Sequence, residues 1–253
     1  FDTGSFGPTE PLYYADVSRR DFNSEVIGVL PVPEGQGPTD ATHAVILSSS
    51  AFYPQGGGQE GDYGQLTQHD VVVTVLDTQK VGDVILHLCD GELKVGEAVS
   101  GELDWPRRKQ LMDHHTAVHI VGGAARRILG PHIYQAGANK SVESGRLDIT
   151  HFNRLTREDL DTIEALANKV LGEVSRTEKT ELNRKDADEI YGFDLYQGGA
   201  PKGNSIRVLK IAEHDVQACG GTHHDEPGQI GSIRIVRSNA VQDGVERLHI
   251  VAG

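Results

Sequence analysis

Two short segments far apart in the chain carry side chains that bind metal ions. His115 and His119 are four positions apart in the first segment, and Cys219 and His223 are four positions apart in the second. On an α-helix, a spacing of four places two imidazoles on one face, close enough to share an ion. In the second segment, the two glycines that follow Cys219 allow a sharp bend between thiol and imidazole. Each pair alone is a weak signal, and the combination is more specific.

The donor set formed by these two pairs favours zinc. Imidazole nitrogens with a thiolate sulfur suit tetrahedral Zn²⁺, so we expect His115, His119, Cys219 and His223 to bind one zinc ion. Thr116 stands where a peptidase of the HExxH type has its glutamate, which excludes that class. The separation of the pairs does not match a zinc finger. His114 and His224 are poorer candidates, because helical rotation and strand alternation turn them away from their neighbours.

The charge of the chain is unevenly distributed. Its 253 residues carry a net charge of −13, which by itself counts against a nucleic-acid partner. Residues 1–104 hold four basic and 17 acidic groups, whereas residues 105–253 hold 20 of each. The acidity therefore belongs to the first part, and the part with the candidate metal site is neutral. We expect any RNA to approach residues 105–253, with the acidic part turned away except at its glycine loop.

Other features of composition restrict the class of protein. No run approaches the 18 apolar residues of a spanning helix, and the start lacks the pattern of a signal peptide, so no membrane partner is expected. Two cysteines make no disulfide framework, and a free thiolate at Cys219 indicates the cytoplasm. Cys89 is expected to be a buried strand residue. Phe1 at the start and Met112 as the single methionine suggest a segment of a longer polypeptide.

The pattern of the sequence changes at residue 104. Before it, short β-branched runs alternate with turn residues and predict a small antiparallel β-barrel over residues 1–104. These runs lie at 25–30, 43–47, 71–76, 84–88 and 98–103. After it, helical spacing runs to about Leu129, and a second helix opens at Thr156 with Asp159 as a capping partner. Strand-like segments at 133–136, 145–151, 206–211, 231–236 and 245–251 and a short helix at 185–191 complete the chain. Residues 105–253 thus form a helix-and-antiparallel-sheet layer domain, and the fold class is α+β.

A glycine-rich stretch lies in the first part. Residues 56–61 formally satisfy the G-x-G-x-x-G pattern of dinucleotide-binding proteins. That motif must open a helix, but a further strand follows here, so we expect no nucleotide cofactor. Gly56, Gly57 and Gly58 are expected to form a tight barrel loop or, alternatively, a loop that also lines the pocket of the second domain.

Together with their surroundings, these motifs resemble the editing domain of alanyl-tRNA synthetases and the related free-standing editing proteins. The resemblance runs from about residue 11 to the end and departs mildly at His114, Val118 and His224. The residues that carry it are Arg108, Met112, 115–119, 219–223, the stretch 52–59 with Asp62 and Gly64, and 244–248.

The resemblance implies hydrolysis of the ester of tRNA(Ala) that carries serine or glycine, in a zinc-containing site of a synthetase. An alanine pocket rejects serine or glycine by only about 1–3 kcal/mol, so a second, hydrolytic site is required. Three alternatives remain open: a free-standing trans-editing deacylase, an esterase that acts on another aminoacyl-tRNA such as that of threonine, and a non-catalytic zinc-stabilised module that binds tRNA.

The resemblance also assigns roles to individual residues. His115, His119 and Cys219 hold the ion, and His223 is either a ligand or a base, because four protein ligands would close a tetrahedral shell. Alternatively, the ion anchors the amino group of the ester, and a hydroxyl of the tRNA helps to deliver water. Thr116 and Gln135 are candidates for contacts with the amino acid or the terminal ribose, and the three glycines of the loop for lining the pocket. The expected tRNA contacts are Arg107, Arg108, Lys109, Arg126, Arg127, Lys140, Arg146, Lys202, Arg234, Arg237 and Arg247.

Overall fold

The computed structural model describes all residues, 1–253, and divides into two compact units, Phe1–Lys109 and Gln110–Gly253. The division falls within the long helix α1 (Trp105–Leu129), whose start follows the change of composition at residue 104. None of the helices combines the length and the apolar character that a membrane span requires.

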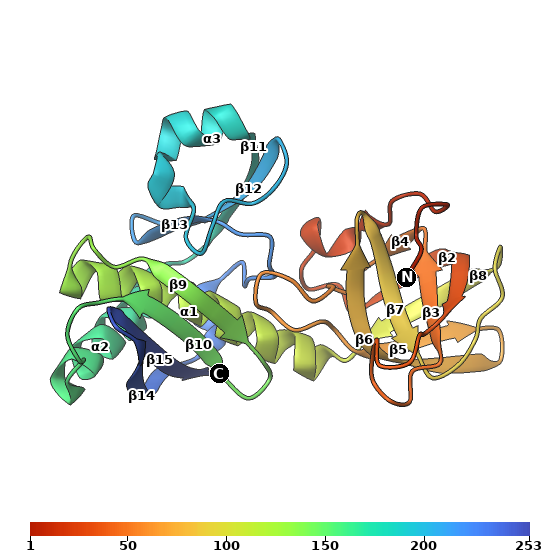
Figure 1. The fold of residues 1–253 in the computed structure, drawn as a ribbon, viewed down its shortest axis with the longest axis horizontal. Helices are drawn as coiled ribbons and strands as arrows, with labels where there is room; N and C mark the ends of the chain where they lie inside the picture. Colours follow the sequence, from red (N-terminus) through yellow and green to blue (C-terminus); the bar gives the residue numbers. More distant parts are fainter. The chain divides into compact units, whose positions relative to one another are not determined.

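The first unit is a closed barrel of antiparallel strands in the order β2-β3-β7-β6-β5-β8 (Figure 1). The strands are β2 (Asp21–Pro31), β3 (His43–Leu47), β5 (Gly64–Gln68), β6 (Val71–Val81), β7 (Val84–Cys89) and β8 (Ala98–Leu103). The short strands β1 (Glu10–Pro11) and β4 (Ser49–Ser50) pair beside it, and η1 (Leu12–Tyr14) follows β1. Phe52, Leu66 and Val75 are fully buried in the barrel core. The predicted antiparallel barrel is confirmed.

The second unit contains a four-stranded antiparallel sheet in the order β14-β15-β10-β9. Its strands are β9 (Gln135–Lys140), β10 (Gly145–Thr150), β14 (Ile233–Gln242) and β15 (Val245–Ala252). Helices α1 and α2 (Arg157–Glu173) cover one face of this sheet (Figure 1). Leu147 and Ile149 of β10 and Leu248 and Ile250 of β15 point to that face and enter the shared core, because alternate residues of a strand face the same side.

A smaller sheet, β11-β12-β13, belongs to the same unit. It consists of β11 (Glu178–Asn183), β12 (Ser205–Ile211) and β13 (Asp215–Ala218), accompanied by α3 (Arg184–Tyr191), η2 (Phe193–Leu195) and η3 (Pro227–Ile230). Sequence patterning did not indicate β11 and β13, because their residues are largely polar and exposed or half-buried. The mixed α+β class with helices and antiparallel sheets after the barrel is confirmed.

Two local motifs have the backbone geometry that their residue types favour. Thr156 caps α2: its hydroxyl accepts the Asp159 N–H at 3.1 Å, and the Asp159 carboxylate accepts the Thr156 N–H at 2.8 Å. In the glycine-rich stretch, Gly57 and Gly58 adopt φ of 58° and 76°, which glycine tolerates without strain. The chain then continues into β5 rather than into a helix, which excludes the dinucleotide motif.

Candidate metal centre

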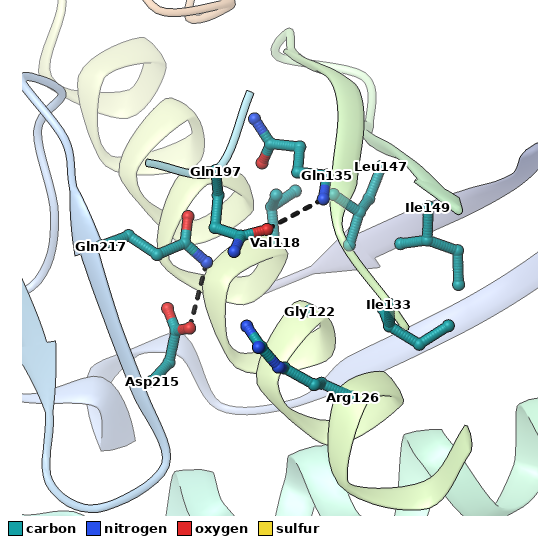
Figure 2. A pocket seen from close by; sticks show the side chains of 10 residues that line it. All are labelled: Val118, Gly122, Arg126, Ile133, Gln135, Leu147, Ile149, Gln197, Asp215 and Gln217. Atoms are coloured by element: carbon teal, nitrogen blue, oxygen red, sulfur yellow. Dashed lines mark hydrogen bonds between the residues drawn. The ribbon is translucent and has the colours of Figure 1, made fainter. Parts of the chain in front are cut away.

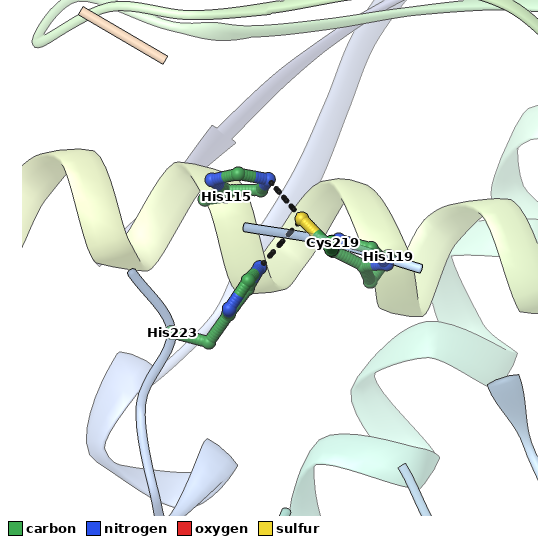
Figure 3. Close-up of side chains that lie close together, drawn as sticks. All are labelled: His115, His119, Cys219 and His223. Carbon is green, nitrogen blue, oxygen red and sulfur yellow. Dashed lines mark hydrogen bonds between the residues drawn. The ribbon is translucent and has the colours of Figure 1, made fainter. Parts of the chain in front are cut away.

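The structure brings the four predicted donor side chains together (Figure 3). His115 and His119 project from one face of α1, while Cys219 and His223 lie in the loop that follows β13. Their potential ligand atoms all lie within 4.8 Å of one another. The Sγ atom of Cys219 is 3.4 Å from Nε2 of His115 and 3.4 Å from Nε2 of His223. The group could hold a metal ion.

The electrostatics favour the metal-binding protonation state of three of the four side chains, His115, His223 and Cys219. Burial lowers the pKa of His115 to about 3 and also lowers that of His223, so both rings are neutral. Burial would raise the pKa of Cys219, but the neighbouring rings of His115 and His223 outweigh it and bring this pKa well below its usual value. Neutral imidazoles and a thiolate are the forms that ligate metals.

The ring nitrogens that face the sulfur of Cys219 test whether a cation fits. In His223, Nδ1 has no hydrogen-bond partner, and Nε2 faces the sulfur. A cation among the atoms that face one another, Sγ of Cys219 and Nε2 of His115 and His223, would satisfy their lone pairs without adding protons. Nδ1 of His223 lies on the other side of the ring and would not bind the same ion. The residues present therefore fit a cation that prefers nitrogen and sulfur.

His119 is oriented by a carboxylate that sequence reasoning missed. Its Nδ1 donates to Oδ2 of Asp215 at 3.1 Å. Burial lowers the pKa of His119, but its hydrogen bonds with Asp215 and Cys219 outweigh this and raise the pKa to about 9. Histidines that bind metals commonly donate their second N–H to a carboxylate. Nothing in the sequence singles out Asp215, because it lies in a short polar strand far along the chain from α1.

Side chains of the small sheet hold the loop that carries Cys219 and His223. Arg207 donates from Nη1 to the carbonyl oxygens of Cys219 at 3.2 Å and Gly221 at 3.0 Å. Lys179 donates to the carbonyl oxygen of His223 at 2.8 Å, and the Thr177 hydroxyl donates to that of His224 at 2.8 Å. These bonds fix the backbone from which both ligands project.

The neighbouring histidines face other partners. His224 places Nε2 2.6 Å from Oδ1 of Asp113, and its backbone N–H donates to the fully buried hydroxyl of Thr116 at 3.1 Å. His114 lies with Nδ1 2.7 Å from the carbonyl oxygen of Ser141. Neither belongs to the group of four, and Thr116 links α1 to the loop.

A small cavity of about 20 Å³ is lined in part by Asp215, the partner of His119 (Figure 2). Oδ2 of Asp215 accepts from His119, while Oδ1 accepts from Nε2 of Gln217 at 3.0 Å. The backbone N–H of Gln135 donates to Oε1 of Gln197 at 2.9 Å. The lining residues are Val118, Gly122, Arg126, Ile133, Gln135, Leu147, Ile149, Gln197, Asp215 and Gln217.

In the barrel unit, Arg108 is fully buried. Its Nε donates to both carboxylate oxygens of Asp62, at 3.1 and 2.9 Å, and its Nη2 donates to Asp62 as well. Further donations reach the carbonyl oxygens of Val17 at 3.1 Å and Ala51 at 2.6 Å. This guanidinium has no surface for a phosphate, so we propose an architectural role for Arg108 in place of a tRNA contact.

The remaining predicted residues divide by environment. Gly56 pairs with Gln59 across the tight turn formed by Gly57 and Gly58, with backbone hydrogen bonds of 3.0 and 2.9 Å. Cys89 is fully buried, and burial raises its pKa to about 12. Lys140 is buried at the end of β9, and burial lowers its pKa. The turn and Cys89 belong to the barrel unit, whereas Lys140 belongs to the unit of the metal centre.

Comparisons with known proteins agree with this arrangement. Residues 9–107 match the family model described as tRNA synthetases class II (A), and residues 206–249 match the threonyl and alanyl tRNA synthetase second additional domain. The alanine–tRNA ligase of Halorubrum lacusprofundi is 44% identical over 97% of this chain and 26% of its own length. Those of Natronomonas pharaonis and Saccharolobus islandicus are 45% and 43% identical over 97% of this chain.

The chain spans about a quarter of the length of these curated relatives. The matched span includes both units, the barrel and the unit that carries the metal centre. The chain therefore corresponds to the editing region of the alanyl-tRNA synthetase family.

Proposed function

We propose that this chain hydrolyses the ester bond of tRNA(Ala) that has wrongly received serine or glycine. The observation that carries the proposal is the convergence of four metal-ligating side chains within 4.8 Å in a chain of the editing region. We further propose that it acts as part of an alanyl-tRNA synthetase, because 97% of the chain matches such enzymes and only 26% of their length is covered.

We propose zinc as the ion, held by His115, His119, Cys219 and His223. A zinc ion there supplies a Lewis acid that polarises the carbonyl of an ester. Asp215 orients His119 through the hydrogen bond at Nδ1. His223 is the residue that the geometry makes most adjustable, because its Nδ1 has no hydrogen-bond partner to fix the ring. We therefore propose that His223 is the residue that alternates between binding the ion and acting as a base.

The small cavity beside Asp215 supports recognition of serine. A volume of about 20 Å³ accommodates one water-sized group, which is the size of a serine hydroxyl. Gln135 and Gln217 offer amide groups at its wall, and Asp215 offers a carboxylate oxygen. A serine hydroxyl exchanges hydrogen bonds with such groups, while the methyl of alanine leaves them unpaired, so correctly charged tRNA is spared.

Two further residues take supporting roles in this proposal. Thr116 positions the second ligand loop by accepting the backbone N–H of His224. The ammonium of buried Lys140 and the thiolate of Cys219 attract each other, which favours the charged form of both groups. Both roles are indirect and require no contact with the amino acid.

The test is deacylation of seryl-tRNA(Ala), glycyl-tRNA(Ala) and alanyl-tRNA(Ala) by the wild-type chain and by His115→Ala and Cys219→Ala variants. We expect hydrolysis of the first two substrates and loss of activity, with loss of zinc, in both variants. His132→Ala is the matched control, because His132 lies in the same unit outside the cluster. Full activity of zinc-free variants would refute the metal mechanism.

A parallel assay with seryl-tRNA(Thr) separates the alternatives. Preference for seryl-tRNA(Thr) would assign the chain to the threonine system, and binding of tRNA(Ala) without hydrolysis would make it a binding module. The proposal requires hydrolysis of seryl-tRNA(Ala) in preference to seryl-tRNA(Thr).

A further inference from the structure

The four-stranded sheet has a second, open face opposite α1 and α2 (Figure 1). Residues that alternate with the core positions of β10 and β15 point to this face. The strand register aligns them in two rows that run across all four strands. The first row is Arg237, His249, Arg146 and Asn139, and the second is Asn239, Arg247, Asp148 and Gly137.

These rows concentrate positive charge in a chain whose net charge is −13. Asp148 is their single acid, and it is engaged by Arg247 through two hydrogen bonds of 2.7 and 2.9 Å. Arg146 approaches the same carboxylate only to 3.8 Å. Arg237, at the outer strand, is exposed and forms no ion pair. Two of the three guanidiniums therefore lack a hydrogen-bonded counter-charge.

His249 reports the field at the centre of the first row. Its pKa is lowered by partial burial and by the neighbouring guanidiniums of Arg237, Arg247 and Arg146, with Asp148 opposing them. His249 also lies with Nε2 2.9 Å from the side-chain oxygen of Asn239. The three arginines thus act on one spot of the sheet surface rather than on three separate places.

Arg146 contributes a partly exposed side chain to this face. Its side chain is 37% exposed, yet its Nε atom is buried and has no hydrogen-bond partner. A guanidinium presents five N–H donors in a planar fork that matches the oxygens of a phosphate. The buried Nε does not meet such an oxygen in this conformation, so the exposed part of the side chain is what Arg146 offers to a phosphate.

The residue types of the rows distinguish the kind of recognition. Sheets that read single-stranded RNA stack bases on aromatic side chains, and neither row contains Phe, Tyr or Trp. Arginine and asparagine donors without aromatic partners suit phosphate oxygens, which carry no sequence information. Adjacent strands lie about 4.8 Å apart, so each row offers donors over a width comparable to a nucleic-acid backbone segment.

We propose that this open face binds the phosphodiester backbone of RNA without regard to base sequence. The inference rests on the proposed function, since a chain that acts on charged tRNA needs a surface for its backbone. It goes beyond that function by assigning the contact to the face of the sheet that lies opposite α1. Arg146, Arg237 and Arg247 are the charged contacts.

The test measures the affinity of the full chain for two uncharged RNA hairpins of equal length and different stem sequence over a series of KCl concentrations. We expect Arg146→Gln and Arg237→Gln each to weaken binding to both hairpins by the same factor. Each should also reduce the slope of log K against log salt by roughly 0.7–0.9, the contribution of one phosphate contact. Lys169→Gln on α2 is the matched control, because it removes an equal charge from an exposed site of the same unit.

Several results would overturn the inference. These are an unchanged salt slope in both arginine variants, an equal loss in the lysine control, or a loss confined to one hairpin. Binding to mixed phosphatidylserine and phosphatidylcholine vesicles that is as tight as hairpin binding, and that depends on the same arginines, would assign the face to a lipid surface instead.

The assay uses uncharged RNA, so it is independent of hydrolysis. A wild-type chain that deacylates seryl-tRNA(Ala) normally but does not bind the hairpins would contradict the inference alone. Absence of deacylation with intact hairpin binding would contradict the proposed function alone. In the deacylation assay, the same arginine variants should raise KM and leave kcat unchanged.

Discussion

The two units each bury a polar centre, and the two centres are built in opposite ways. Around Arg108 in the barrel, the guanidinium donates to Asp62 and to two backbone carbonyl oxygens. Around Cys219 in the second unit, the sulfur atom and ring nitrogens of His115, His119 and His223 lie within 4.8 Å of one another. The first centre pairs donors with acceptors inside the protein, and the second collects acceptors that suit a cation.

Buried histidines of the two units show the same contrast. In the barrel, His87 donates from Nδ1 to the carbonyl oxygen of Val45 at 2.9 Å, and its Nε2 lies 2.7 Å from the Ser50 hydroxyl. In the metal centre, Nδ1 of His223 is buried without a partner. A satisfied polar group stabilises a fold, whereas an unsatisfied one is destabilising. His87 therefore has the hydrogen bonds of a structural residue, whereas those of His223 are incomplete.

The largest effect should come from breaking the barrel centre. Replacing Arg108→Met leaves the carboxylate of Asp62 buried without its charged partner and should lower the free energy of unfolding by about 3–5 kcal/mol. Urea denaturation measures the change. The double variant with Asp62→Asn should recover part of the loss, because no buried charge remains. A loss under 1 kcal/mol in the single variant would contradict the architectural role.

Acid should destabilise the barrel through His87. Burial lowers the pKa of His87 to about 4, so the unfolded chain, with a pKa near 6.5, takes up its proton first. The contribution is complete above pH 6.5 and is lost as the pH falls from 6.5 to 4, by about 3 kcal/mol in total.

Comparison with His87→Gln isolates this contribution from other groups that titrate in acid. The difference in unfolding free energy between wild type and variant should shrink across that pH range. A difference that stays constant from pH 7 to pH 4 would show that His87 does not take part.

A smaller effect should follow from removing the carboxylate that orients His119. Asp215→Ala deletes the acceptor at Nδ1 and should weaken zinc binding by about 10–100-fold. Competition with a chromophoric chelator measures the affinity. Glu213→Ala is the matched control, an exposed acid of the same unit that contacts Lys210 rather than a metal ligand or the ligand loop. Equal losses in the two variants would argue against an orienting role for Asp215.

The smallest effect should come from the link between α1 and the ligand loop. Thr116→Val keeps the shape of the side chain but leaves the His224 N–H without its acceptor. We expect zinc affinity to fall by roughly fivefold, equivalent to about 1 kcal/mol. Thr116→Ser should restore the wild-type value, and its failure to do so would assign the loss to packing.

Sequence reasoning predicts the parts of the fold whose residues repeat with a clear period. The β-branched runs anticipate five strands of the barrel, and helical spacing anticipates α1 and α2 with the cap at Thr156. It misses β5, β11 and β13, because their mostly polar residues carry no clear alternation of apolar side chains. Those strands form through pairing with neighbours that the local sequence does not specify.

The candidate site also contains residues that the sequence indicates and residues that it does not. The sequence indicates the four donors, because the two members of each pair are only four positions apart. Asp215, Arg207 and Lys179 are invisible at that level, because their roles depend on where the small sheet places them. The burial of Arg108 is likewise a tertiary property, which the local sequence does not show.

The central claim is that the lone pairs around Cys219 hold a metal ion while the barrel centre holds none. The most direct measurement is the metal content of the purified chain by mass spectrometry, for wild type, His115→Ala, Cys219→Ala and the barrel variant Cys89→Ala. We predict stoichiometric zinc in wild type and in Cys89→Ala, and its loss in the two cluster variants. Zinc retained at full stoichiometry in both cluster variants, or a wild-type chain that takes up no metal from a zinc buffer, would contradict the account.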